Sequence, residues 1–162
     1  MLSIRKAQSV ELTIISELAH AIWHPTYASI LSKDQIEFML EDMYSLKALK
    51  EKLDAGRMFY LAYEGAKAVG YIALTALSEQ SVLRIESLYL LPETQGKGFG
   101  KQLIDFAAEK AFDEKLAVLE LNVNRGNKAQ LFYKKQGFII VREVDIPYHG
   151  YVLDDYVMQK SL

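Results

Sequence analysis

The sequence predicts an α/β fold in which a mixed, mostly antiparallel central sheet carries helices on both faces. Runs rich in β-branched and aromatic residues alternate with amphipathic helical segments. Most neighbouring strand segments are joined by tight turns and should be antiparallel, whereas one pair is joined by a helical segment at residues 101–112 and should be parallel. Because no repeat or Gly/Pro/Ser-rich linker interrupts the 162 residues, we expect one domain over residues 1–162.

The first third of the chain is mainly helical in pattern. Its expected elements are a strand at residues 2–6 and helices at residues 10–23, 33–43 and 45–53. Pro25 is expected to end the first helix. Ser32 and Gln35 form a capping box that opens the second.

The rest of the chain is dominated by strand patterns. The expected strands are residues 58–63, 68–74, 82–91, 117–123, 138–145 and 151–158, with helices at residues 101–112 and 128–136. Residues 64–67 and 147–150 are expected to be hairpin turns, and Pro92 and Pro147 to separate elements.

Composition excludes several classes of function. The chain is 51% hydrophobic and 25% charged, with a net charge of −2, so neither a nucleic-acid partner nor an anionic membrane surface is indicated. The absence of cysteine excludes disulfides, thiolate nucleophiles and cysteine zinc sites. The sequence contains no signal-peptide core and no apolar run near the ~20 residues of a membrane span, so a cytoplasmic location is expected.

A glycine-rich segment follows the strand pattern at residues 82–91 and precedes a helix pattern. Glycines at positions 96, 98 and 100 remove side chains that would keep an anion at a distance, and Lys97 and Lys101 add positive charge. A helix start directs unpaired backbone N–H groups and the positive end of the helix dipole at one point. The segment is therefore either a cradle for linked phosphates or a flexible strand–helix turn.

Two common phosphate-binding patterns do not match. The P-loop pattern requires a glycine at Gln95 and a Ser or Thr at Gln102. The dinucleotide pattern requires a glycine at Lys101 and a first strand near the start of the chain. The remaining motif, Gln95-x-x-Gly98-x-Gly100, resembles the coenzyme A loop of Gcn5-related N-acetyltransferases (GNAT).

A second motif also resembles this family. It consists of an asparagine at a strand end, a short helix with Ala129 and Tyr133 four residues apart, and then Gly137 and Phe138. Together the two motifs span about a third of the chain, and the order of the expected elements matches the family. The resemblance implies the GNAT acyl-CoA N-acyltransferase fold, acetyl-CoA as co-substrate and no metal.

The resemblance also implies how the co-substrate is held. In the family the loop amides hold the pyrophosphate, and the strand before the loop opens from its neighbour to pair with the pantetheine arm; a later asparagine contacts the arm. The matching residues here are Leu88, Tyr89, Leu90, Gln95, Gly96, Lys97, Gly98, Phe99, Gly100, Lys101 and Asn127.

Two residues are candidates for proton transfer. Tyr133 resembles the tyrosine that protonates the departing thiolate, although a packed aromatic beside Phe132 and Phe138 is the alternative. Glu86 is the candidate general base, because an acidic residue in this region is the base in several relatives. A salt bridge from Glu86 to a neighbouring cation is equally compatible with the sequence, and Arg84 lies on the same strand face.

The acceptor is expected to be the primary amine of a small molecule. Trp23 and Tyr27 lie where relatives place the acceptor pocket, and Asp154 is a further candidate contact. Softer similarity to bacterial polyamine-type acetyltransferases makes a polyamine the first hypothesis. The alternatives are a protein N-terminal or lysine acetyltransferase and a non-catalytic acyl-CoA sensor.

Two further expectations concern metal and assembly. His20 and His24 are four residues apart, a spacing that can bind metal, but no third ligand is evident. The sequence does not fix the oligomeric state; because relatives often dimerise through sheet edges or terminal strands, a homodimer is among the expected assemblies.

Overall fold

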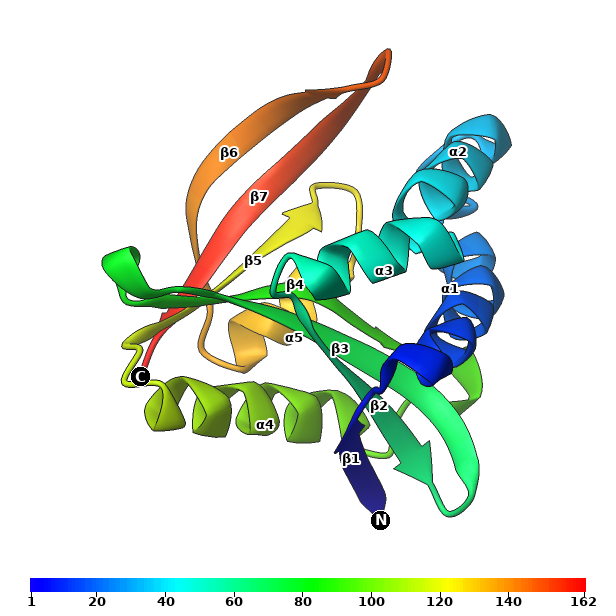
Figure 1. The fold of residues 1–162 in the computed structure, drawn as a ribbon. Helices are drawn as coiled ribbons and strands as arrows, with labels where there is room; N and C mark the ends of the chain where they lie inside the picture. Colours follow the sequence, from blue (N-terminus) through cyan, green and yellow to red (C-terminus); the bar gives the residue numbers. More distant parts are fainter. The chain divides into compact units, whose positions relative to one another are not determined.

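The computed structural model describes residues 1–162 and contains seven strands in a mixed, mostly antiparallel sheet, together with five α-helices. The strands are hydrogen-bonded in the order β1-β2-β3-β4-β5-β7-β6 (Figure 1). The chain forms two compact units, the first made of residues 1–75 and 87–103 and the second of residues 76–86 and 104–162. Strand β4 (Val82–Leu90) and helix α4 (Phe99–Asp113) each contribute to both units.

The first unit combines three helices with an antiparallel sheet. Its complete elements are β1 (Leu2–Lys6), α1 (Leu12–Tyr27), α2 (Lys33–Tyr44), α3 (Leu46–Asp54), β2 (Met58–Glu64) and β3 (Lys67–Leu77). The three helices contact one another, and β2 pairs with both β1 and β3. Apolar residues at helical spacing on α1, among them Ile15 and Ile22, are fully buried with Phe59 and Leu61 of β2.

Side-chain caps set the helix boundaries in this unit. Ser32 Oγ accepts a hydrogen bond from the Gln35 backbone N–H at 3.1 Å, which is the first half of the predicted capping box; the Gln35 side chain donates to Met39 Sδ at 3.7 Å. Ser45 Oγ accepts from the Ala48 N–H at 3.2 Å and so separates α2 from α3.

The prediction that Pro25 ends the first helix is wrong, because α1 continues to Tyr27. Proline removes one backbone donor and so one hydrogen bond of the last helical turn. The helix nevertheless continues, because the residues around Pro25 supply other donors. The Thr26 hydroxyl donates to the Ile22 carbonyl at 2.7 Å, and the Ala28 N–H donates to His24 at 3.0 Å.

The second unit contains the remaining strands. Its complete elements are β5 (Val118–Asn124), α5 (Ala129–Lys135), β6 (Ile139–Tyr148) and β7 (Tyr151–Ser161). Strand β5 pairs in parallel with β4 and in antiparallel with β7, as the helical connection predicted. The core of this unit includes Leu83, Leu119, Phe138 and Met158.

The β6–β7 hairpin corrects a second prediction. Pro147 lies inside β6 rather than in the turn, which is a position an edge strand tolerates because one side of its backbone needs no partner. The turn itself is His149-Gly150, and both residues have positive φ, 47° and 86°. This conformation matches the twist of a tight hairpin, visible where the two long strands join in Figure 1.

Candidate active site

The glycine-rich turn of the first unit is anchored at both ends and exposed between them. Thr94 and Phe99 are buried, whereas residues 95–98 are exposed. The Thr94 hydroxyl donates to the Leu91 carbonyl at 2.7 Å, and the Leu91 N–H donates to Val69 of β3 at 2.8 Å. The loop is therefore held on a rigid base.

Within the turn the backbone itself requires glycine. Gly96 and Gly98 have φ values of 82° and 78°, a left-handed conformation that side chains disfavour. A Cβ added at either position would meet no atom within 4 Å. Crowding by neighbouring protein atoms is therefore not the reason that glycine occupies these two positions. They leave an open, side-chain-free surface over the backbone.

Helix α4 begins directly at this surface. Its first intrahelical hydrogen bond runs from the Gln102 N–H to the Gly98 carbonyl at 3.2 Å, so the N–H groups of Phe99 and Gly100 have no acceptor within the helix. The positive end of a 15-residue helix is directed at the same place. This arrangement suits an anion, and a diphosphate in particular, because it offers several donors without a side chain in the way.

The lysine at the centre of the turn has a protein partner. Lys97 Nζ lies 3.0 Å from Glu64 Oε2 of β2, and both side chains are exposed. Glu64 thus partly balances the positive charge that Lys97 brings to the turn. The backbone N–H groups are therefore the main hydrogen-bond donors that the turn offers to an anion.

Strand β4 changes its environment before the turn. The ladder to β5 covers only Val82–Ile85. On its other side β4 approaches β3 so closely that a Cβ at Gly70 would collide with the Tyr89 carbonyl and lie 2.7 Å from the Leu90 side chain. Residues 88–90, predicted to pair with a pantetheine arm, therefore lie beyond the β5 ladder and are half-buried.

Five aromatic side chains converge in the first unit, and we call them the aromatic cluster. Its members are Trp23, Tyr27, Tyr44, Tyr71 and Tyr89, contributed by α1, α2, β3 and β4. Ring centroids of neighbouring members lie 4.8 to 6.4 Å apart in tilted or edge-on arrangements. These separations are the ones that aromatic pairs prefer.

Hydroxyl groups tie this cluster to β4. Tyr27 and Tyr89 share a hydrogen bond of 2.7 Å between their hydroxyls, and the Tyr44 hydroxyl is 2.9 Å from Ser87 Oγ. Trp23 Nε1 and the Tyr71 hydroxyl are buried without a hydrogen-bond partner. Burial raises the pKa values of Tyr44, Tyr71 and Tyr89, so their phenols stay neutral at working pH.

Two members of this cluster were singled out from the sequence. Trp23 and Tyr27 were expected either to line an acceptor pocket or to cover the sheet, and the structure places them with Tyr44 and Tyr71, which were not singled out. Tyrosine occurs ten times in the chain, and no local spacing distinguishes the ones that converge.

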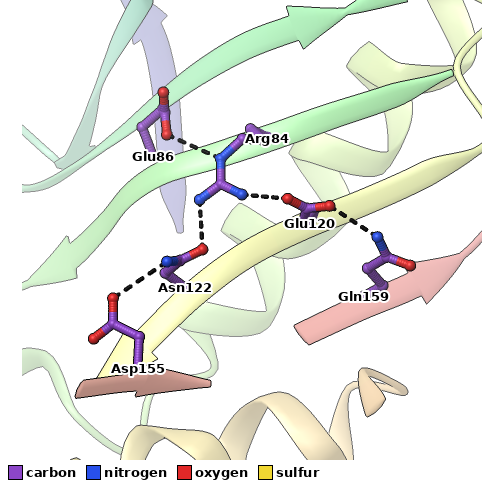
Figure 2. Close-up of polar contacts among 6 residues, drawn as sticks. All are labelled: Arg84, Glu86, Glu120, Asn122, Asp155 and Gln159. Atoms are coloured by element: carbon purple, nitrogen blue, oxygen red, sulfur yellow. Dashed lines mark hydrogen bonds and ion pairs between the residues drawn. The ribbon is translucent and has the colours of Figure 1, made fainter. Parts of the chain in front are cut away.

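The second unit contains a polar network on one face of β4, β5 and β7, which we call the Arg84 network. Its members are Arg84, Glu86, Glu120, Asn122, Asp155 and Gln159 (Figure 2). The predicted base Glu86 accepts from Arg84 Nε at 3.2 Å. The sequence allowed either this ion pair or a catalytic role for Glu86. The ion pair is compatible with the catalytic role.

Asp155 is the electrostatically perturbed carboxyl of this network. Burial raises its pKa, while the hydrogen bond from Asn122 acts in the opposite direction. The adjacent Asp154 was the predicted acceptor contact. Its Oδ1 accepts from Asn124 Nδ2 at 3.2 Å, and its backbone carbonyl accepts from the Arg125 N–H.

The two remaining predicted residues are Tyr133, on α5, and Asn127, just before that helix. Tyr133 is buried at 8% exposure, with Phe132 and Phe138 edge-on to its ring at 5.3 and 5.7 Å. Asn127 Oδ1 accepts from the Ala129 N–H at 2.9 Å and so closes the start of the helix. Packing fixes the position of the Tyr133 ring, and a general acid requires such a fixed position.

No group of three or more His, Asp or Glu side chains is arranged to hold a metal ion. None of the helices combines the length and the apolar character needed to cross a bilayer.

Comparison with known proteins identifies the family. The model of the acetyltransferase (GNAT) domain matches residues 27–159. The spermidine N(1)-acetyltransferase of Thermoplasma acidophilum is 32% identical over 145 residues, which cover 85% of this chain and 88% of that protein.

Solved structures agree with this assignment. The PaiA N-acetyltransferase of Thermoplasma acidophilum in complex with coenzyme A superimposes with a TM-score of 0.84 at 27% identity, covering 100% of this chain and 99% of the other. A Gcn5-related N-acetyltransferase from Rhodopseudomonas palustris shares the fold with a TM-score of 0.85 at 21% identity, covering 99% and 95%. The chain therefore belongs to the GNAT family of N-acetyltransferases.

Proposed function

We propose that residues 1–162 act as one domain that transfers the acetyl group of acetyl-CoA to a primary amine of a small molecule, by direct attack in a ternary complex. The observation that carries this proposal is the exposed turn at residues 95–98, whose two left-handed glycines uncover the backbone at the start of α4. The coenzyme A bound to the PaiA structure supports the same assignment for this chain.

In this proposal the diphosphate is held by backbone donors at residues 96–101, and the pantetheine arm pairs with Leu88, Tyr89 and Leu90. Gln95 and Asn127 complete the contacts. The arrangement depends on backbone geometry, so a change of backbone conformation tests it better than a change of side chain.

Gly98→Ala provides that test, with Gly65→Ala as its matched control. Both glycines have positive φ, 78° and 61°, and both would place the new Cβ in open space. Each substitution should cost about 1 kcal/mol of stability from backbone strain. Only Gly98→Ala should weaken acetyl-CoA binding in calorimetry, by tenfold or more; equal affinities in the two variants would contradict the proposed diphosphate site.

The chemistry proposed for the site moves protons at both the nitrogen and the sulfur. The ammonium of the acceptor loses a proton to Glu86, directly or through water, and the freed lone pair attacks the thioester carbonyl. The carbon–sulfur bond then breaks as the sulfur takes the hydroxyl proton of Tyr133, and the nitrogen, cationic after the attack, gives up its second proton to the phenolate through water. A phenol with an ordinary pKa near 10 can supply a proton to a thiolate as charge develops on the sulfur.

Tyr133→Phe tests the acid. The edge-on contacts to Phe132 and Phe138 would be kept, so the fold and acetyl-CoA affinity should be retained while kcat falls by about 10². A variant with unchanged kcat would contradict the role of the hydroxyl. A wild-type chain that binds acetyl-CoA and acetylates no amine would instead be an acyl-CoA sensor.

For the acceptor we propose a polyamine such as spermidine. The support is the 32% identity to a spermidine N(1)-acetyltransferase. Trp23 and Tyr27 are proposed to line the acceptor site from α1, and Asp154 to attract the cationic chain. Turnover of peptide N-termini or lysine side chains, with none of polyamines, would contradict this proposal.

A further inference from the structure

Arg84 is the centre of a network in which each side of its guanidinium has a different acceptor. Nε donates to Glu86, Nη1 to Glu120 and Nη2 to Asn122 at 2.7 Å (Figure 2). The parallel ladder pairs Arg84 with Glu120, and Asn122 follows two residues later on the same face of β5. The planar guanidinium is therefore fixed by acceptors from two strands.

The network continues to β7 in a defined direction. Because arginine can only donate, the Asn122 oxygen must face Arg84, and the Asn122 Nδ2 group then donates to Asp155 Oδ2 at 3.2 Å. Gln159 donates to the second oxygen of Glu120 at 2.8 Å. Hydrogen bonds therefore connect Glu86 to Asp155 through Arg84 and Asn122.

The two carboxylates bonded to Arg84 differ in exposure. The Glu120 side chain is only 8% exposed and is held by both Arg84 and Gln159, so it serves as an anchor. The Glu86 side chain is 19% exposed and lies on β4 two residues before Leu88. One planar guanidinium bonded to both carboxylates restricts their orientation.

We propose that Arg84 is a positioning residue for Glu86: anchored by Glu120 and Asn122, its guanidinium holds the Glu86 carboxylate in one orientation to accept the proton of the acceptor amine. This inference rests on the proposed role of Glu86 as general base. Arg84 itself neither gains nor loses a proton. The charged groups of this unit that lie with Glu86 on the same sheet face are Arg84, Glu120 on β5, Asp155 on β7 and Arg142 on β6.

The test is the effect of substitutions on kcat and on KM for the amine, measured with saturating acetyl-CoA. Glu86→Gln should lower kcat by about 10², because the proton acceptor is lost. Arg84→Gln should lower kcat about tenfold with little change in KM, because Glu86 is kept but no longer held in one orientation. Arg84→Lys keeps the charge but not the planar set of donors, so its kcat should fall in the same way. In the Glu86→Gln background, Arg84→Gln should cause no further loss of kcat.

Arg125→Gln is the matched control. Arg125 is another arginine of the same unit, bonded to Asp145 and to backbone carbonyls of β6 and β7. Its kcat and KM should equal those of the wild type. Acetyl-CoA affinity, measured by calorimetry, should be the same in all these variants.

The outcomes separate this inference from the proposed function. If Glu86→Gln lowers kcat while Arg84→Gln and Arg84→Lys keep the wild-type kcat, the positioning role is overturned and the base assignment stands. If Glu86→Gln keeps the wild-type kcat, the base and the role of Arg84 fall together. If Arg84→Gln lowers kcat as much in the Glu86→Gln background as in the wild type, its effect does not act through Glu86 and the inference is overturned. If the wild type binds acetyl-CoA but acetylates no amine, the proposed function fails and the inference fails with it.

Discussion

The aromatic cluster and the Arg84 network solve the burial of polar atoms in opposite ways. The cluster uses hydroxyls and an indole that carry no charge, and burial raises the phenol pKa values so that they remain neutral. The network buries charges and balances them with one guanidinium and two amides. We therefore expect substitutions that alter charge, and changes of pH, to affect the free energy of unfolding mainly through the Arg84 network. Substitutions in the aromatic cluster should affect it mainly through packing.

The largest expected effect is the loss of Arg84. Arg84→Met leaves the buried Glu120 carboxylate without its counter-charge, and removal of one partner from a buried pair costs about 3 kcal/mol or more. Arg84→Met/Glu120→Gln, in which the buried charge is removed with its partner, should recover most of this loss in urea unfolding. A double variant as unstable as the single one would contradict the charge-balance account.

A smaller effect is expected from single hydroxyls of the aromatic cluster. Tyr44→Phe removes the hydrogen bond to Ser87 and should cost about 1 kcal/mol. Tyr71→Phe removes a buried hydroxyl that has no partner, so its free energy of unfolding should equal or exceed that of the wild type. Equal losses in the two variants would mean that both hydroxyls are satisfied.

The smallest effect concerns pH. The raised pKa of Asp155 means that the folded chain binds a proton more tightly than the unfolded chain, so this stabilisation is complete at low pH. It is lost as pH rises from about 4, the ordinary pKa of aspartate, through the higher folded-state value. Asp155→Asn should flatten this part of the stability profile. The buried phenols have the same sign but act only above about pH 10.

Local signals in the sequence predicted the element order, the parallel β4–β5 pair and the GNAT family, all of which are confirmed. The two prolines at positions 25 and 147 misled because neither ends its element. Beyond Pro25 the Thr26 hydroxyl and the Ala28 N–H supply donors that continue α1, and Pro147 lies in an edge strand, which tolerates a missing N–H.

Long-range contacts were harder to predict. Arg84 and Glu86 could be placed on one strand face by alternation, but Glu120, Asn122, Asp155 and Gln159 join them only through the register of β4, β5 and β7. No residue spacing encodes that register, since it is set by packing of the whole sheet. The same holds for Tyr44 and Tyr71, which meet through helix–sheet packing.

The central claim is that backbone donors at residues 96–101 hold the linked phosphates of a coenzyme. Calorimetry with acetyl-CoA and with S-acetylpantetheine, which has the same thioester arm without the diphosphate, tests it most directly. The account predicts micromolar or tighter binding of acetyl-CoA and an affinity for S-acetylpantetheine at least a hundredfold weaker. Equal affinities, or no binding of acetyl-CoA to the folded chain, would contradict it.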